Sequence, residues 1–176
     1  MKKLGITFLL LSIIVTAVVV GASRNENGVE YLRIHIRANS NSELDQSVKY
    51  RVKSAIVDYL TPFIAECETK EQAIKMLTLE RENLEGVANS VLNLHGFDYE
   101  SKVAVRKESF PTRVYGDFTL EEGIYDAIIV ELGEGKGDNW WCVVYPPLCF
   151  TKTQNVKYKS KILEVIEAFK ERVHRG

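Results

Sequence analysis

The sequence is poor in the residues that most often build metal centres. Its three histidines, His35, His95 and His174, are scattered, and no two of them have the spacing of a metal-binding pair. It also lacks internal repeats and low-complexity tracts, which excludes solenoid and compositionally disordered classes. We therefore expect no metal ion and no cofactor.

The chain also lacks a strong charge of either sign. It has 23 Lys and Arg residues against 24 Asp and Glu residues, for a net charge of −1. Removal of residues 1–22 would take away two lysines and leave 21 basic against 24 acidic residues, a net charge of −3. A weakly acidic domain offers no basic surface to a phosphate backbone, so we expect no nucleic-acid partner.

The first residues have the pattern of a targeting segment. Lys2 and Lys3 precede an uncharged, mostly aliphatic run from Leu4 to Ser23. Basic residues resist translocation, so we expect the rest of the chain to be exported across the cytoplasmic membrane. The run exceeds the usual signal core of about 7–15 residues and barely reaches the roughly 20 residues that span a bilayer. It is therefore either a cleaved signal peptide or an N-terminal anchor that holds the protein at the membrane.

The remaining chain has the length of one domain. Residues 1–23 form the signal peptide or anchor, the polar residues 24–30 form a linker, and residues 31–176 form a single predicted domain. A chain of this length buries a sufficient core without a metal ion or disulfide bonds.

Hydrophobic periodicity predicts the order of the elements. Apolar and polar residues alternate over 32–37, which indicates a strand with one buried and one exposed face. A capping turn and a helix over 43–60 follow, with Lys49 on its exposed side and Pro62 ending or kinking it. A capping box at Thr69 begins a second amphipathic helix that runs toward Gly96.

Beyond Gly96 the period changes to that of strands. A half-exposed strand surrounds Val103, and the segments 124–132 and 140–145 are apolar on both faces, as is typical of central strands. A closing amphipathic helix covers 162–173. This order predicts an α+β domain, with a mainly antiparallel sheet packed with helices.

A glycine-rich segment, 133–139, joins the last two predicted strands. A phosphate-binding loop would place Lys136 before Ser or Thr at the start of a helix, whereas Gly137 and a strand follow here. The segment is either a simple connection, in which the glycines only allow positive φ values, or a recognition loop whose backbone amides are open to a partner. For the second case, we predict that five residues contact the partner: Lys136, Asp138, Asn139, Trp140 and Trp141.

The two tryptophans are adjacent on a predicted strand, so their rings point to opposite faces. One of them is expected in the core, and the other is either an anchor for a partner or a second core residue.

The three cysteines are Cys67, Cys142 and Cys149. Cys142 and Cys149 flank a Pro-Pro corner that could bring them together, and an exported protein can carry a disulfide bond. They form either a disulfide or two buried thiols, whereas Cys67 is expected to be a packed or half-exposed thiol. Neither a Cys–His pair nor a carboxylate pair has a local signature of catalysis, so we expect no enzymatic activity and no catalytic residues.

Three segments resemble the stage II sporulation protein R family. They are Arg37–Ser42 with Asp45-Gln46, Phe110–Gly116, and Gly133–Cys142 continuing through Pro146-Pro147 to Phe150. The resemblance extends from about Leu32 to Phe150, and the preceding apolar segment agrees with it.

The resemblance implies a signalling protein of spore-forming bacteria that is made in the forespore. Such a protein is exported into the space between the forespore and mother-cell membranes. There it activates a membrane-embedded aspartic peptidase, which processes the precursor of the mother-cell sigma-E factor. Two alternatives remain from the residues alone: a secreted cell-wall binding module that uses an exposed tryptophan against peptidoglycan, and a secreted hydrolase.

Overall fold

A four-stranded mixed sheet is the centre of the domain. The computed structural model describes residues 31–151 and 156–175, so the predicted segments 1–23 and 24–30 lie outside the described residues. The strand order is β2-β5-β1-β6, in which β1 is parallel to β5 and the other two pairs are antiparallel. The strands are β1 (Leu32–Arg37), β2 (Ser101–Phe110), β5 (Gly123–Leu132) and β6 (Asn139–Tyr145).

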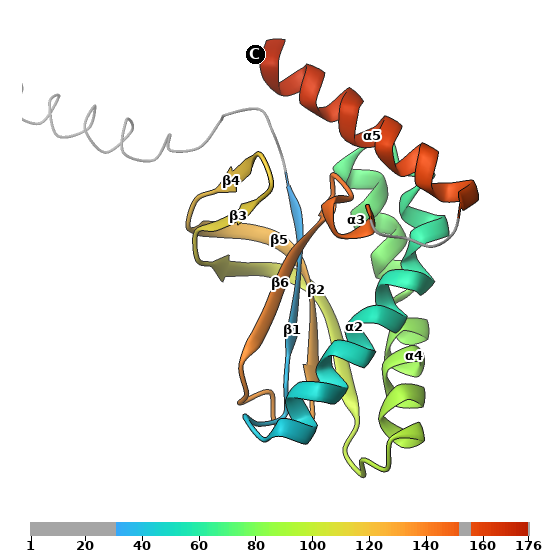
Figure 1. Cartoon of the computed structure of the whole chain (residues 1–176), viewed down its shortest axis with the longest axis vertical. Coiled ribbons are helices and arrows are strands. Elements are labelled where there is room, and N and C mark those ends of the chain that lie inside the picture. The colour runs from blue at the N-terminus through green and yellow to red at the C-terminus, as the bar shows by residue number, and fades with distance from the viewer. Residues whose placement is uncertain (1–30, 152–155, 176) are drawn as a thin grey trace, which may run out of the picture. The chain divides into compact units, whose positions relative to one another are not determined.

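Three helices cover one face of this sheet (Figure 1). They are α2 (Glu43–Ile64), α3 (Lys70–Leu79) and α4 (Arg81–Leu94). The predicted α+β class, with helices packed on a mainly antiparallel sheet, is therefore confirmed. Among the described residues, no helix is long and apolar enough to cross a membrane.

The helix boundaries follow the local sequence with one difference. The Thr69 hydroxyl accepts a hydrogen bond from the backbone N–H of Gln72, as in the predicted capping box. The return bond to the Gln72 side chain comes from the N–H of Glu68, one residue before the cap. The single helix predicted after this cap is divided, because Glu80 has φ −85° and ψ 2° and separates α3 from α4. Pro62 lies within the last turn of α2, which ends at Ile64.

The opposite face of the sheet is also covered, which contradicts the prediction of an exposed face on the first strand. A separate hairpin of β3 (Arg113–Tyr115) and β4 (Phe118–Leu120) was not predicted. The far ends of β2 and β5 bend toward this hairpin, on the left of Figure 1. Arg33 and His35 point to this face, and they are only 0% and 4% exposed.

The last strand, β6, is an edge strand and not the central strand that its apolar sequence predicted. A short 3₁₀ helix, η1 (Leu148–Phe150), and the final helix α5 (Val156–Arg175) follow it. The Phe169 ring of α5 packs against Tyr31, Phe118 and Tyr145, which buries the end of β6. An edge strand covered in this way has the apolar sequence of a central one.

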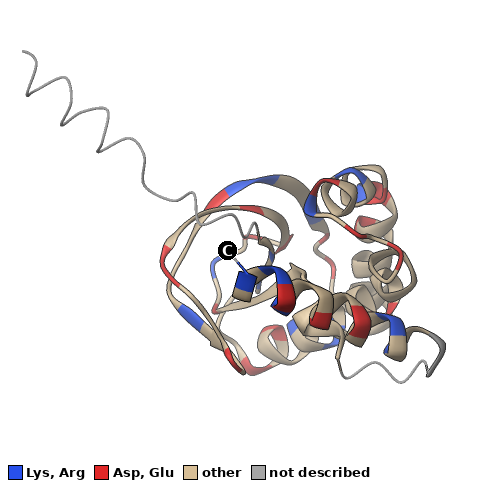
Figure 2. Cartoon of the chain, turned by 90° about the horizontal axis from the view of Figure 1, so that it is seen from above, with Lys and Arg blue, Asp and Glu red and all other residues tan. Residues whose placement is uncertain are grey.

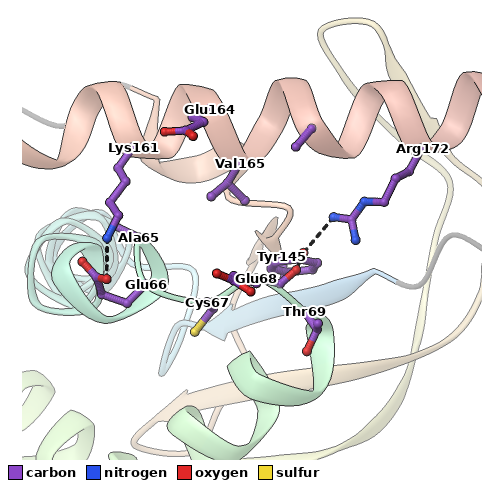
Figure 3. A pocket seen from close by; sticks show the side chains of 11 residues that line it. Ala65, Glu66, Cys67, Glu68, Thr69, Tyr145, Lys161, Glu164, Val165 and Arg172 are labelled. Atoms are coloured by element: carbon purple, nitrogen blue, oxygen red, sulfur yellow. Dashed lines mark hydrogen bonds and ion pairs between the residues drawn. The ribbon is translucent and has the colours of Figure 1, made fainter.

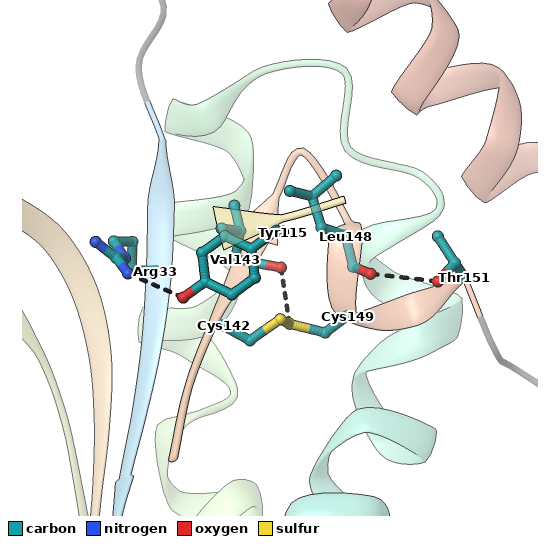
Figure 4. The surroundings of a disulfide bond; sticks show 7 residues. All are labelled: Arg33, Tyr115, Cys142, Val143, Leu148, Cys149 and Thr151. Atoms are coloured by element: carbon teal, nitrogen blue, oxygen red, sulfur yellow. Dashed lines mark hydrogen bonds between the residues drawn. A yellow bond between two sulfur atoms is a disulfide. The ribbon is translucent and has the colours of Figure 1, made fainter. Parts of the chain in front are cut away.

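A disulfide bond joins Cys142 in β6 to Cys149 in η1, across a sequence separation of 7 residues (Figure 4). It fixes the chain reversal at Pro146-Pro147 against the strand. The third cysteine, Cys67, is a buried free thiol.

Loss of this bond is expected to lower the free energy of unfolding. For so short a loop, the chain-entropy relation gives about 2–3 kcal/mol. Urea unfolding of the Cys142→Ser/Cys149→Ser double variant would measure the difference, with reduced wild-type protein as the matched control. Alkylation in denaturant without reductant should modify Cys67 alone, and modification of all three cysteines would contradict the bond.

Candidate functional site

The segments Arg37–Ser42, Phe110–Gly116 and Gly133–Cys142 are far apart in the sequence and meet around β1. The first and third form a junction at the end of β1, which we call the loop junction: the turn 38–41 with the loop 133–139. The second lies over the face of β1 that carries Arg33 and His35. These two regions are the candidate functional site.

Backbone hydrogen bonds fix the loop junction. The N–H groups of Lys136 and Gly137 donate to the carbonyl oxygens of Asn39 and Ala38, at 3.1 and 2.8 Å. The side-chain oxygens of Asn39 and Asn41 accept from the N–H groups of Glu134 and Asp138, at 2.9 and 2.6 Å. The loop is therefore held against the turn along most of its length.

The glycines of the loop allow this close approach. Gly133 and Gly135 have φ values of 56° and 61°, a region that other residues rarely adopt. A Cβ on Gly137 would lie 2.1 Å from the carbonyl oxygen of Ser40, closer than any packing allows. The glycine-rich composition thus has a structural explanation in the loop junction.

Asp45, in the first turn of α2, holds the turn 38–41 in place. Its carboxylate accepts hydrogen bonds from Ser40 Oγ at 2.5 Å, Tyr99 OH at 2.5 Å and Asn39 Nδ2 at 3.1 Å. Burial opposes the ionisation of Asp45, but these hydrogen bonds outweigh it and hold the pKa of the carboxyl below its usual value. Burial and the same carboxylate raise the pKa of Tyr99.

Lys49 connects α2 to the loop and is 1% exposed, so its predicted exposed position is wrong. Its ammonium donates to the carbonyl oxygen of Asp138 at 2.9 Å and to Gln46 Oε1 at 2.6 Å. Burial lowers the pKa of Lys49, and the charge of Asp138 acts in the opposite direction.

The structure places the five predicted contact residues as follows. Lys136, Asp138 and Asn139 are exposed, and Lys136 pairs with Glu134 at 2.9 Å. Trp140 and Trp141 are both half-buried and lie on opposite faces of the sheet. In the register of β6 with β1, they pair with Ile36 and His35. The loop amides are not open, because the N–H groups of residues 133–138 all donate within the chain. The N–H groups of this loop are therefore not available to a partner.

The second region is the arginine cluster, which we define as Arg33, His35, Arg37, Glu108 and Trp141 with the covering rings of Phe110, Tyr115 and Tyr125. Arg33 is at its centre. Its guanidinium carbon lies 4.2 Å from the centre of the Phe110 ring and 4.8 Å from that of Tyr125. Its Nη2 donates to the Tyr115 hydroxyl at 2.9 Å, which connects β1 to the hairpin (Figure 4).

Glu108 joins the other members of the cluster. Its Oε1 accepts from Arg37 Nη2 at 2.6 Å and lies 2.7 Å from His35 Nδ1. Burial opposes the ionisation of Glu108, but hydrogen bonds from His35 and Arg106 and the charge of Arg37 hold its pKa below the usual value. The ionised carboxylate requires a donor, so Nδ1 of His35 carries the proton.

Four buried polar atoms of this cluster have no hydrogen-bond partner among the described residues. They are Arg33 Nε, Arg33 Nη1, His35 Nε2 and Trp141 Nε1. An unpaired buried donor costs about 1–3 kcal/mol, and a buried guanidinium costs several kcal/mol more unless it is paired. Cation–π contact with the aromatic rings stabilises the guanidinium by roughly 0.5–2 kcal/mol, which does not offset these costs. Unpaired buried donors of this kind are unusual in a stabilising core.

A pocket of about 470 Å³ lies elsewhere, between α5 and the connection from α2 to α3 (Figure 3). Its wall includes Cys67, whose Sγ donates to the carbonyl oxygen of Phe63. Burial, and then the charge of Glu66, raise the pKa of this thiol, which disfavours the nucleophilic thiolate. Arg172 donates to the Tyr145 hydroxyl at its other end. The pocket does not assemble a nucleophile with a base.

Charges elsewhere on the domain are mixed in sign. Figure 2 shows acidic and basic residues interspersed along the C-terminal helix, where Lys170 pairs with Glu167 and Arg175 with Glu171. Among the described residues, no group of three or more His, Cys, Asp and Glu side chains is placed to hold a metal ion. The candidate site therefore depends on the loop junction and the arginine cluster.

Sequence reasoning missed the arginine cluster almost entirely. It placed His35 on the polar side of its strand, and it included Trp141 among the partner contacts, but it did not connect them with Arg33 or Glu108. The available signal was the segment Phe110–Gly116, whose Phe110 and Tyr115 provide two of the covering rings.

Comparison with known proteins agrees with the three segments. The family model for stage II sporulation protein R matches residues 29–155. Stage II sporulation protein R of Bacillus subtilis (strain 168) is 30% identical over 166 residues, which cover 88% of this chain and 74% of that protein. No solved structure matches. The loop junction and the arginine cluster both lie within the matched residues, and the chain belongs to the stage II sporulation protein R family.

Proposed function

We propose that the chain is an exported intercellular signalling protein of sporulation. It is made in the forespore and activates the membrane-embedded aspartic peptidase that processes the mother-cell sigma-E precursor, without enzymatic activity of its own. The observation that carries this proposal is the family match over residues 29–155. That match includes every strand of the sheet and both parts of the candidate site.

Two further observations support export into the space between the two membranes. The basic and then apolar residues 1–23 have the charge pattern that directs the following chain across the membrane, whether as a signal peptide or as an anchor. The bond between Cys142 and Cys149 is of a kind that persists in oxidising compartments and is rare in the bacterial cytoplasm.

We place the contact with the peptidase at the exposed side of the loop junction. Lys136, Asp138 and Asn139 present side chains there, on a loop that backbone hydrogen bonds hold in one conformation. A fixed loop loses little conformational entropy on binding. Trp140 and Trp141, at the start of β6, provide partly exposed aromatic surface beside it.

Complementation in a spore-forming host tests the proposal. A strain that lacks its own stage II sporulation protein R should recover sigma-E precursor cleavage when the full chain is expressed in the forespore, as measured by immunoblot during sporulation. The same strain should recover much less cleavage when the expressed chain carries Lys136→Glu combined with Asp138→Ala. Lys75→Glu, on α3, is the matched control for a charge reversal away from the loop.

The outcomes separate the proposal from its alternatives. If the chain is exported and cleavage of the sigma-E precursor is not recovered, the signalling role is contradicted. Retention of the protein by purified peptidoglycan would favour a wall-binding module, and turnover of peptidoglycan would favour a hydrolase. Normal cleavage of the precursor with the loop variant would show that the contact lies on another surface of the domain.

A further inference from the structure

β2 is an edge strand, and α4 closes only the first part of its outer edge. β5 is its neighbour on the inner side of the sheet. The N–H groups of Ser101 and Val103 point away from β5 and donate to two side chains of α4. Their acceptors are Asn89 Oδ1 at 2.7 Å and Glu85 Oε1 at 2.8 Å. The beginning of the edge is therefore satisfied within the chain.

The second half of the same edge is open. The register with β5 is unbroken over residues 101–110, and residues of an antiparallel pair alternate between bonding the neighbouring strand and facing away from it. Val105, Lys107 and Ser109 therefore present their N–H and C=O groups outward. No hydrogen bond within the described part of the chain involves these six groups. Arg106, Lys107 and Ser109 are exposed, so this stretch, which we call the open edge (residues 105–109), is accessible.

The open edge ends at a groove of about 600 Å³ at the base of the β3–β4 hairpin. Ser109 belongs to both, because it lines the groove together with Phe110 and Pro111. Ile124 pairs with Ser109 in the register, lines the groove and is 73% exposed. Glu122, which also lines it, disfavours a second carboxylate there. The groove therefore suits an apolar side chain.

The exposed charged side chains of the open edge are cations. The side chain of Lys107 is 70% exposed and that of Arg106 is 47% exposed, and the two point to opposite faces of the strand. Their partners Asp126 and Glu131 lie on β5, one strand further from the edge. The acidic Glu108 is only 12% exposed. A strand added at this edge would therefore meet positive charge on both of its faces.

A second copy of the chain fits this edge poorly. Antiparallel pairing of two β2 strands about Lys107 would place Lys107 opposite its own copy. Like charges directly opposite each other destabilise a pair of strands, whereas opposite charges stabilise it. A strand with two adjacent acidic residues would instead place one carboxylate beside each of the two cations. The charges of the open edge thus favour an acidic segment of another protein.

We propose that the open edge of β2 binds an extended acidic segment of a partner protein, which adds to the sheet as a further antiparallel strand. The segment pairs with the three outward residues, and its carboxylates lie beside Arg106 and Lys107. An apolar side chain of the segment fills the groove. The open edge pairs with residues 124–128 of β5, in the half of that strand distant from the loop 133–139. It is therefore a second contact surface, and the inference does not rest on the proposed function.

NMR on the ¹⁵N-labelled full chain measures this binding. The probe is the peptide acetyl-Leu-Thr-Glu-Glu-Val-amide, whose residues would lie opposite Ser109 to Val105 in that order. Its Leu then enters the groove, and its two Glu residues lie opposite Lys107 and Arg106. We expect saturable shifts and slower hydrogen exchange at the three outward amides. The peptide with Gln in place of both Glu residues should bind about fivefold or more weakly at low salt.

Two N-methylated forms of the peptide test the main-chain pairing. Methylation of the first Glu removes the N–H that would donate to the carbonyl oxygen of Lys107, so it should abolish binding. Methylation of the second Glu, whose N–H would point away from β2, should weaken binding far less. Both measurements use the unaltered protein, so they do not depend on the folding of a variant.

A charge reversal on the protein tests the acidic character of the segment. Lys107→Glu should weaken binding of the Glu peptide and strengthen binding of the Gln peptide relative to it. Lys102→Glu is the matched control, because Lys102 is exposed on the same strand beside the part of the edge that α4 closes. That control should bind both peptides like the unaltered protein.

Several results would overturn the inference. They are no saturable shift at the three amides, equal affinity of the Glu and Gln peptides, and equal affinity of the two N-methylated peptides. Protection of these amides that rises with protein concentration without peptide would assign the edge to a second copy of the chain, which also contradicts it. These measurements use purified protein, so their failure leaves the sporulation role intact, and a failed complementation leaves the binding result intact.

Discussion

Gly137→Ala is expected to lower the free energy of unfolding by about 3 kcal/mol, from backbone displacement and lost hydrogen bonds. The added Cβ would lie 2.1 Å from the carbonyl oxygen and 2.5 Å from the carbonyl carbon of Ser40, both of them backbone atoms. Relief requires the loop to move away from the turn. That movement breaks the bond from Gly137 N–H to the Ala38 carbonyl and strains the neighbouring bond from Asp138 to Asn41.

Urea unfolding followed by tryptophan fluorescence measures this loss, because Trp140 follows the loop directly. Gly86→Ala is the matched control, since Gly86 lies exposed in α4 with nothing within 4 Å of its added Cβ. That change should raise stability by about 0.5–1 kcal/mol through helix propensity. An unchanged unfolding midpoint for Gly137→Ala would show that the loop does not dock on the turn.

Asp45→Ala is expected to cost about 3–4 kcal/mol, because it leaves the donors of Ser40, Tyr99 and Asn39 without their charged acceptor. The exposed Asp58, on the same helix, is the control, and Asp58→Ala should change stability by less than about 0.5 kcal/mol. Equal losses of stability on the two substitutions would show that Asp45 does not stabilise the loop junction.

The effect of Asp45→Ala should also depend on pH. The pKa of Asp45 is lowered in the folded protein, so its stabilisation is complete above the unfolded pKa of about 3.9. It is lost as the pH falls through the lower folded pKa. The difference between wild type and variant should therefore be constant near neutral pH and shrink only in strong acid, whereas a difference that shrank near pH 6 would identify another group.

Local sequence patterns predicted the elements that depend on local interactions. The capping box at Thr69, the first strand and the helix that begins at Glu43 all follow from residues within one or two turns of each other. The division at Glu80 was missed, because an apolar stripe continues with helical spacing across a single residue that leaves helical geometry.

The errors arose where distant segments cover a surface. Arg33 and His35 have the alternating pattern of an exposed strand face, but a hairpin of two three-residue strands more than 75 residues later buries them. Strands so short have no reliable periodicity. Lys49 was placed in solvent for the same reason, since its acceptor, the carbonyl oxygen of Asp138, is 89 residues away.

The three glycines of the loop allowed two interpretations, positive φ values in a simple connection or backbone amides open to a partner. Gly133 and Gly135 do have positive φ values, Gly137 provides close contact with Ser40, and the loop amides donate within the chain. Composition alone could not distinguish a loop that receives a partner from a loop that receives another segment of its own chain.

β1 separates the point where the chain enters the domain from the loop junction. The chain enters the domain at Tyr31, beside Phe169, and the loop junction begins six strand residues later, at the other end of β1. At about 3.3 Å per residue, the strand separates the two by roughly 20 Å. A contact made through Lys136 and Asp138 would thus lie at the opposite end of β1 from the point where the chain enters the domain.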